Sequence, residues 1–363
     1  MAKTAFVTGA TGFVGLNLVE ALRQQGWDVI ALHRASSDLS GLDRFPGVGR
    51  VVGDVTDARS LKNLIPYNID CVFHVAGNTS LWGRAQVEQT KVNVRGTRNV
   101  VRAALEAGAK RLVHTSSIVA YGLHGGTITE DTPTRGSAVP INYIRSKALS
   151  EREVRKGISS GLRAVILNPA NMIGRYDTSS WARMFRLVKQ GRLPAVPPGG
   201  GSFCHVREVA MAQSAAAERG RVGHNYLLGG AQASYVGLAN AIADALGVRR
   251  RVIALHPGVL NVYARLEEWI APVFGREPDI AEEVWNSLSR EAVVEGFKPR
   301  PEDDLLKVFG LADEDLDDLV LNILERCRCR IPSPAETAGM PAVRTVADLF
   351  VFVEQARRSR VQR

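Results

Sequence analysis

Short apolar runs alternate with helical patterns along the first half of the chain. Such runs predict strands, and apolar residues recurring every three or four positions predict amphipathic helices. Because the strands are almost continuously apolar, we expect both of their faces to be buried, as in a parallel sheet covered by helices. The expected strands are 4–8, 28–33, 50–53, 71–75, 111–115 and 163–167, and the expected helices are 13–25, 58–65, 86–107 and 143–156.

After Pro169 this alternation loosens. A stretch rich in proline and glycine at 193–201 predicts a loop. We expect strands at 203–206 and 225–228 that return to the same sheet. Further helices are expected at 234–246, 259–274 and 280–289.

The pattern as a whole predicts a doubly wound α/β fold of the Rossmann type. We expect a dinucleotide-binding domain and a smaller, mostly helical substrate lobe, followed by a helical tail to which we assign no role. The first comprises 1–168 plus about 203–232, the second 169–202 plus about 233–299, and the tail 300–363. The tail carries acidic runs and one amphipathic helical pattern, which fits a packing helix with a solvated face.

Composition and charge are ordinary for a soluble protein of 363 residues, with 45% hydrophobic residues. The chain contains no apolar run of about 18 residues and no secretory signal pattern, so we expect no membrane span and a cytoplasmic location. The net charge of +9 is scattered without aromatic interleaving, so nucleic acid is not an expected partner. The four cysteines, Cys71, Cys204, Cys327 and Cys329, lack the spacing of a metal site, and we expect no metal.

The strongest motif is the glycine turn TGATGFVG at residues 8–15, which follows the first strand and opens the first helix. Glycine allows a tight turn and a close approach of the backbone to a pyrophosphate, and the helix N-terminus attracts its charge. The spacing is G-x-x-G-x-x-G rather than the usual dinucleotide fingerprint. A turn without a ligand is the alternative. The expected cofactor-binding residues here are Gly9, Thr11, Gly12, Phe13 and Gly15.

The end of the second strand bears on which dinucleotide is bound. An acidic residue there accepts hydrogen bonds from the ribose of NAD, whereas an arginine accommodates the 2′-phosphate of NADP. This chain has Arg34, followed by Ser36 and Ser37, and its first carboxylate is Asp38. The sequence therefore favours NADP, although a solvated surface arginine would give the same pattern.

Tyr143 and Lys147 lie four positions apart in a predicted helix and so share one face. We expect the lysine cation to lower the pKa of the tyrosine, which can then exchange a proton with a substrate oxygen. Ser117 follows the fifth strand, at the edge where open α/β sheets bind ligands, and can orient that oxygen. An ordinary helical pair and a capping serine are the alternatives.

Taken together, these motifs resemble the extended short-chain dehydrogenase/reductases, the superfamily of NAD-dependent epimerases and dehydratases. Within it, the chain looks most like the branch of dihydroflavonol 4-reductase and 3β-hydroxysteroid dehydrogenase. The resemblance covers about residues 1–290. It rests on TGATGFVG, GDVTD, VFHVAG, NVRGTRNV, HTSSIVAYG, YIRSK and NPANMIG, which begin at residues 8, 53, 72, 93, 114, 143 and 168.

The resemblance implies a catalytic set of Ser117, Tyr143 and Lys147, and an oxidoreductase acting on CH–OH groups. It also implies cofactor contacts at both ends of the dinucleotide: Asp54 and Val55 at the adenine, Ala76 and Gly77 near the nicotinamide, Asn93 behind the active site, and Pro169 beside the nicotinamide amide.

Two other functions are open on this resemblance, and a third is disfavoured. Sugar dehydratases carry an Asp-Glu pair where this chain has Ile118 and Val119, which cannot transfer protons, so dehydration is disfavoured. A nucleotide-sugar epimerase is the first alternative, because Asn168 and Pro169 also resemble an epimerase substrate motif. A non-catalytic dinucleotide sensor is the second alternative, but such proteins usually lose the tyrosine or the lysine.

The substrate is expected to be a small, mainly apolar molecule. Asn78, Trp82 and Asn168 are weaker candidates for contacting it, and packing roles are equally open for them. Relatives often form homodimers through two long helices, here near 86–107 and 143–156. For His74, His114 and His205 we favour packing over catalysis.

Overall fold

The structure is a computed structural model in which residues 2–80, 85–124, 126–178, 180–249 and 251–254 are described. The chain divides into two compact units, residues 1–253 and 254–363, and the first contains the main sheet and its helices. Trp82, the predicted helices at 259–274 and 280–289, and the tail 300–363 lie outside the described residues.

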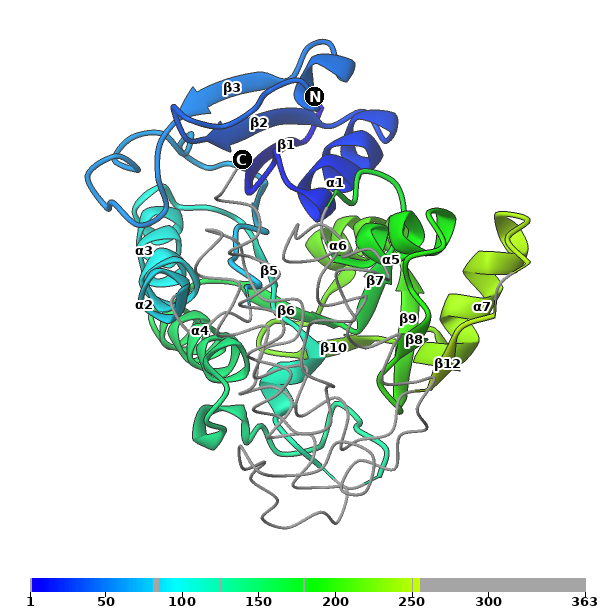
Figure 1. The fold of residues 1–363 in the computed structure, drawn as a ribbon. Coiled ribbons are helices and arrows are strands. Elements are labelled where there is room, and N and C mark those ends of the chain that lie inside the picture. The colour runs from blue at the N-terminus through cyan, green and yellow to red at the C-terminus, as the bar shows by residue number, and fades with distance from the viewer. Residues whose placement is uncertain (1, 81–84, 125, 179, 250, 255–363) are drawn as a thin grey trace, which may run out of the picture. The chain divides into compact units, whose positions relative to one another are not determined.

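A seven-stranded parallel sheet forms the centre of the first unit (Figure 1). Its strand order is β10-β6-β5-β4-β1-β2-β3. The direction in which the strands are added reverses between β1 and β4, so a ligand crevice is expected at the carboxyl ends of these two strands. The strands are β1 (Thr4–Thr8), β2 (Asp28–His33), β3 (Gly49–Val52), β4 (Cys71–His74), β5 (Leu112–Thr115), β6 (Ala164–Pro169) and β10 (Asn225–Leu228).

Helices cover both faces of this sheet, which confirms the predicted doubly wound α/β fold (Figure 1). On one face α1 (Phe13–Gln24) packs against α6 (Val206–Arg219), and on the other α3 (Thr97–Glu106) packs against α4 (Asn142–Ser159). Four short elements pack against α4: α2 (Gln86–Thr90), η3 (Lys91–Gly96), η4 (Ile118–Tyr121) and η5 (Gly136–Ala138), whereas η1 (Leu42–Arg44) contributes Leu42 to the cluster under α1 and α6.

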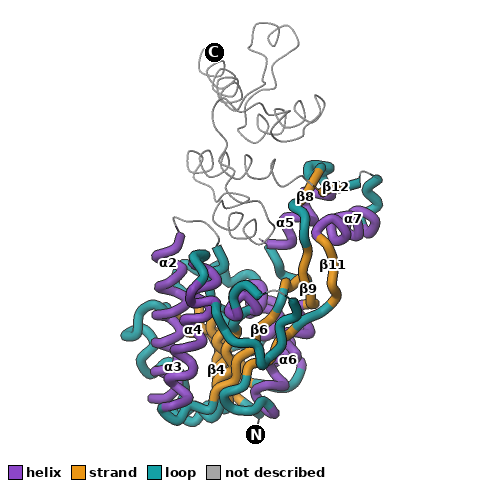
Figure 2. Tube along the Cα trace, turned by 90° about the horizontal axis from the view of Figure 1, so that it is seen from below, coloured by secondary structure: helices purple, strands orange, loops and turns teal. Residues whose placement is uncertain are grey.

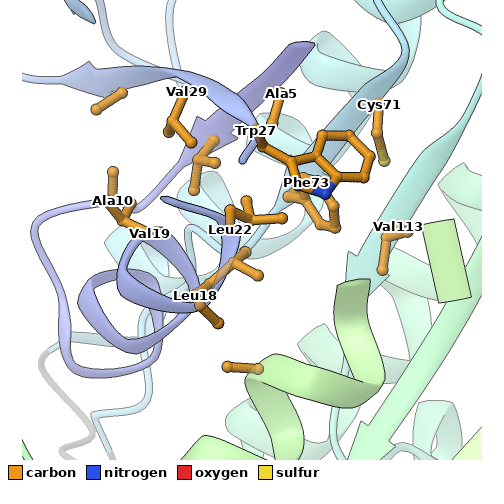
Figure 3. Packing of buried hydrophobic residues seen from close by; sticks show 14 of the residues in the cluster. Ala5, Ala10, Leu18, Val19, Leu22, Trp27, Val29, Cys71, Phe73 and Val113 are labelled. Carbon is orange, nitrogen blue, oxygen red and sulfur yellow. The ribbon is translucent and has the colours of Figure 1, made fainter. Parts of the chain in front are cut away.

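The alternation of side chains along each strand divides the core between the two faces. Cys71 and Phe73 of β4 belong to the cluster under α1 and α6, whereas Val72 between them belongs to the cluster under α3 and α4. In the first cluster the rings of Trp27 and Phe73 pack edge to face, with their centroids 5.9 Å apart (Figure 3). Burial on both faces explains why these strands are apolar at nearly every position.

A second, smaller sheet begins where β6 ends, and Figure 2 shows it beside the main sheet. It consists of β7 (Asn171–Ile173), β9 (Gly200–His205) and β11 (Ala231–Ser234), while β8 (Ala195–Val196) pairs with β12 (Ile253–Ala254). Helices α5 (Ser180–Lys189) and α7 (Tyr235–Ala245) belong to the same part of the chain. The predicted return of 203–206 to the main sheet is therefore wrong, because β9 pairs in parallel with β7 instead.

Two expected helices differ from the structure. Residues 58–65 form successive turns, because Asn63 adopts a left-handed conformation (φ 60°) that a helix does not allow. The expected helix 86–107 is present, but its middle, η3, is a π-helical segment. None of the helices in the described ranges has the length and apolar character needed to cross a membrane.

Replacing Phe73 by alanine should destabilise the first unit. The ring is fully buried against Trp27, and its removal should cost about 3–5 kcal/mol through lost burial and a cavity. Urea denaturation followed by tryptophan fluorescence measures this loss. Tyr67→Ala removes an aromatic ring that is 78% exposed and should change stability by less than about 0.5 kcal/mol. Equal losses in the two variants would contradict the assignment of Phe73 to the core.

Candidate active site

The glycine turn lies at the carboxyl end of β1, at the point where the strand order reverses. Gly9 has a φ of 69°, and a Cβ atom there would lie 2.6 Å from the backbone nitrogen of Ala76. A Cβ atom on Gly15 would lie 2.0 Å from the carbonyl oxygen of Gly9. Both positions therefore require glycine. At Gly9 the turn is in direct backbone contact with the segment after β4, and at Gly15 the first turn of α1 is in direct contact with the backbone of Gly9 and Ala10.

The N-terminus of α1 has free N–H groups and no nearby acidic residue, so it can bind an anionic group. Gly12 precedes the helix without a side-chain cap, and the first turn carries no acidic residue. Gly12 is exposed, and a Cβ atom there would meet nothing closer than 3.4 Å. The first N–H groups of the helix have no partner within it, so they can bind a pyrophosphate between Thr11 and Phe13.

The segment after β4 connects the glycine turn to helix α4. The Ala76 nitrogen donates to the Thr8 hydroxyl at 3.2 Å, and a Cβ atom on Gly77 would lie 3.3 Å from Lys147 Nζ. Asn93 holds this segment, since its Oδ1 accepts from the Asn78 nitrogen at 2.7 Å and its Nδ2 donates to the Asn78 carbonyl at 2.9 Å. The same Nδ2 lies 2.9 Å from the Ser146 hydroxyl of α4.

Ser117, Tyr143 and Lys147 come together at this edge of the sheet. Ser117 follows β5, and its side chain hydrogen-bonds that of Tyr143. Lys147 lies one helical turn after Tyr143, is 6% exposed, and donates from Nζ to the Thr115 carbonyl at 3.1 Å. The end of β5 and one helix therefore place a hydroxyl, a phenol and an ammonium group together, next to the segment that contacts the glycine turn.

The ionisation of this cluster is governed by burial. Burial raises the pKa of Tyr143, and the hydrogen bond with Ser117 opposes this effect. The net shift of the Tyr143 pKa is therefore upward, because desolvation dominates over the hydrogen bond. Burial also lowers the pKa of Lys147 to about 8, against the attraction of the Glu151 charge.

Two buried histidines stack behind Lys147, with His74 and His114 ring centroids 5.2 Å apart. Thr97 Oγ1 donates to the Asn93 carbonyl, so it accepts from His74 Nε2 at 2.9 Å, and Nδ1 accepts from Thr8 Oγ1 at 2.8 Å. Burial, with a smaller effect of Lys147, lowers the pKa of His74 to about 3, and burial lowers that of His114 well below its usual value. Both rings are therefore neutral, and the packing role expected for them is confirmed.

The far end of the expected cofactor site lies after β2 and β3. Arg34 is exposed, and its guanidinium forms no ion pair with any described residue. The Asp38 carboxylate accepts hydrogen bonds from both the nitrogen and the hydroxyl of Ser40, which engage it within the chain. Asp54 lies in a turn in which its Oδ1 accepts a hydrogen bond from the Thr56 nitrogen at 2.8 Å, and Val55 beside it is buried. At this end of the site the Arg34 guanidinium is thus available to a ligand, whereas the Asp38 carboxylate is engaged.

The remaining candidates have packing or connecting positions. Asn168 is fully buried, and its amide nitrogen donates to the Ser117 carbonyl at 3.0 Å and to Glu151 at 2.7 Å, so it is not accessible to a substrate. Pro169 is the last residue of β6. The packing expected for His205 is wrong, because the residue is exposed; it caps α6, where its Nδ1 accepts from the Arg207 nitrogen. Ile118 and Val119 follow Ser117 in η4, as the sequence requires.

Sequence reasoning missed one group in this cluster, the carboxylate of Glu151. It is 3% exposed and accepts from Ser116, Asn168 and Asn225. Its spacing from Lys147, one helical turn, is visible in the sequence. Its partners are not visible there, because two of them lie on strands distant along the chain.

The chain matches the NAD dependent epimerase/dehydratase family over residues 5–229 and belongs to that family. A Synechocystis protein provisionally named as a dihydroflavonol 4-reductase is 32% identical over 289 residues, which are 77% of this chain and 83% of that protein. A 3-beta-hydroxysteroid dehydrogenase of Mycolicibacterium neoaurum is 32% identical over 197 residues, 52% of each chain. The resemblance to this branch is thus confirmed.

Solved structures agree with the fold. The crystal structure of gox2253 is 30% identical with a TM-score of 0.66, covering 98% of this chain and 99% of its own. A UDP-glucose 4-epimerase from Thermus thermophilus in complex with NAD is 25% identical with a TM-score of 0.58, covering 69% of this chain and 86% of its own.

The two buried histidines predict a loss of stability on mild acidification. Their pKa values are below 6.5 in the folded state, so the unfolded chain binds protons more readily, and stability should fall as the pH drops below about 6.5. Each ring should contribute up to about 1.4 kcal/mol per pH unit. Urea denaturation at intervals between about pH 7 and pH 5 measures the slope, in a range where carboxylates with usual pKa values stay largely ionised.

His74→Gln keeps a donor towards Thr97 but removes one titrating ring, so the slope should fall by about half. His33→Gln replaces a histidine at the end of β2 that is not fully buried and should leave most of the slope in place. A flat stability profile in the unmodified protein across this range would refute the argument.

Proposed function

We propose that this protein is an NADP-dependent reductase that acts on the carbonyl group of a mainly apolar small molecule. The cluster of Ser117, Tyr143 and Lys147 beside the glycine turn is the observation that carries the proposal. Membership of the epimerase/dehydratase family and the names of the relatives support redox chemistry on a hydroxyl or carbonyl group.

Each residue has a distinct task in this proposal. When bound, a reduced nicotinamide supplies a hydride to the carbonyl carbon. The Ser117 hydroxyl donates a hydrogen bond to the carbonyl oxygen and holds it near the phenol. Tyr143 gives its proton to that oxygen, which completes the alcohol, and the Lys147 cation stabilises the phenolate that remains.

Burial raises the pKa of Tyr143, so its phenol keeps its proton at neutral pH. This is the form that donates a proton during reduction of a carbonyl group, whereas oxidation of an alcohol requires the phenolate.

NADP is the proposed cofactor because of Arg34. Its exposed guanidinium, with no ion pair among the described residues, suits a 2′-phosphate, while Asp38 is engaged with Ser40. The residues 8–15 and Ala76–Gly77 would hold the pyrophosphate and the nicotinamide side, as the geometry of the glycine turn allows.

The proposed preference for an apolar substrate draws on the lobe. Trp181 packs with Phe203 at 5.0 Å and with Tyr235 at 6.1 Å, which gives this part of the chain an aromatic cluster. Asn78 stays a proposed contact near the substrate, since it directly follows Gly77.

A nucleotide-sugar epimerase is the second candidate, supported by the likeness to the Thermus thermophilus enzyme. The burial of Asn168 weighs against it, because that residue was the sequence feature suggesting a nucleotide-sugar contact. Tightly co-purified NAD together with measurable binding of a UDP-sugar would favour this candidate over the reductase.

The reductase proposal predicts that the protein consumes NADPH with at least one member of a panel of aromatic, steroidal and aliphatic ketones. The loss of NADPH absorbance measures this consumption. Tyr143→Phe should lower kcat by about a hundredfold or more, because the proton donor is lost. NADPH binding, measured by fluorescence, should persist in that variant. Confirmed NADPH binding without turnover of any ketone would count against the proposal.

Arg34→Ala should weaken NADPH binding about tenfold to a hundredfold, the value of charge-assisted hydrogen bonds to a phosphate. The affinity for NADH should stay unchanged, since NADH lacks the 2′-phosphate. Titration calorimetry with each cofactor measures both effects. Arg102→Ala, which removes an exposed arginine of α3, controls for the change in net charge. Equal effects of Arg34→Ala on both cofactors would contradict a role in phosphate recognition.

A further inference from the structure

Glu151 is a buried acid in the middle of α4, one helical turn after Lys147. Burial of a carboxylate is costly unless hydrogen bonds or an opposite charge compensate for it. The nearest cation with a described contact is Arg155, whose Nη2 lies 4.0 Å from Oε2. The buried charge of Glu151 is therefore compensated by its neutral hydrogen-bond donors, by Arg155 and by Lys147.

The carboxylate connects helix α4 to three strands. Oε1 accepts from the Ser116 hydroxyl at 2.5 Å and from Asn168 Nδ2 at 2.7 Å. Oε2 accepts from Asn225 Nδ2 at 3.1 Å, and the same nitrogen donates to Asn168 Oδ1 at 2.9 Å. Ser116 follows β5, Asn168 lies in β6, and Asn225 begins β10.

This network fixes the residue that bears the substrate-orienting hydroxyl. Asn168 Nδ2 donates to Glu151 and also to the Ser117 carbonyl at 3.0 Å. Ser116, immediately before Ser117, is held by Glu151 directly. The Ser117 carbonyl, through Asn168, and the side chain of Ser116 are thereby tied to the helix that carries Tyr143 and Lys147.

Charge balance around Lys147 points to the same residue. The titratable groups that act on or face the lysine are Tyr143 and Glu151 from α4, His74 from β4 and His114 from β5. Tyr143 and both histidines are neutral, so within the described part of the chain Glu151 supplies the negative charge. Arg155 and the buried Tyr121 phenol face Glu151 from its other sides.

We propose that Glu151 is a positioning residue of this site, whose carboxylate ties the Ser117 segment to α4 and supplies the buried charge that keeps Lys147 cationic. This inference deepens the proposed function, but its first test does not rest on it. Lys147 must be protonated to stabilise a phenolate, and Ser117 must be correctly positioned to hydrogen-bond a carbonyl oxygen. In this proposal the Glu151 carboxylate supports both.

The decisive experiment titrates Lys147 in the cofactor-free protein. Competitive labelling with acetic anhydride across a pH series, read by mass spectrometry of the Lys147 peptide, gives the midpoint of its ionisation. In the unmodified protein this midpoint should lie at about 8. Glu151→Gln should move it down by about one unit, a tenfold change in the ratio of charged to neutral lysine.

Glu153→Gln is the matched control. Glu153 lies on the same helix and is also buried, but it pairs with Arg98 and Lys156. Its loss should cost stability and leave the Lys147 midpoint unchanged. An unchanged midpoint in Glu151→Gln, or an equal shift in Glu153→Gln, would overturn the inference.

Glu151→Asp separates the two tasks and serves also if Glu151→Gln does not fold. It keeps the charge but shortens the reach, so the Lys147 midpoint should stay near that of the unmodified protein. A fall of the midpoint in this variant as large as one unit would contradict the charge role.

Turnover of a ketone provides the second readout. Glu151→Asp should lower kcat about tenfold or more through misplacement of Ser117, while KM for NADPH changes little. An unchanged kcat would contradict the positioning role. If the unmodified protein reduces no ketone, the proposed function fails, whereas the Lys147 titration still decides whether Glu151 controls the lysine.

Discussion

The burial of one ammonium group, that of Lys147, constrains most of the surrounding structure. A cation inside a protein must be met by carbonyl oxygens or negative charge, and must not be met by other cations. Here the Thr115 carbonyl accepts from it, and the histidines behind it stay neutral. The edge of the sheet is where such a group can be placed, because strand ends present carbonyl oxygens that no neighbouring strand uses.

Direct backbone contact is the second constraint at the carboxyl edge of the main sheet. The glycine turn meets the end of β4 without side chains between them, so the N-terminus of α1 comes close to the segment that faces Lys147. A run of hydrogen bonds from Ala76 through Thr8, His74 and Thr97 to Asn93 connects the same elements through the interior. The glycine turn and the residues proposed to transfer the proton are thus connected by one set of backbone contacts and hydrogen bonds.

Much of this could be predicted from the sequence, where local rules suffice. The bounds of β1 and β2 follow from their apolar runs, and the strand–turn–helix at residues 4–24 follows from its glycines. Other features depend on contacts between distant residues. The pairing of β9 with β7 and the hydrogen bonds of Glu151 to Asn225 have no local signal. The direction of the Tyr143 pKa shift escapes sequence reasoning for the same reason, since desolvation is a property of the assembled site.

The π-helical segment η3 has a consequence for how this region tolerates change in length. Such a segment holds one residue more than α-helical geometry would place in the same rise, and it contains Asn93, which holds the segment after β4. Deleting one residue there would therefore restore regular helical spacing, whereas deleting one from a regular part of a helix rotates the remainder by about 100°. The first deletion would displace Asn93 but leave the buried face of α3 in place. The irregular turn thus sets the position of Asn93 separately from that of the helix that follows it.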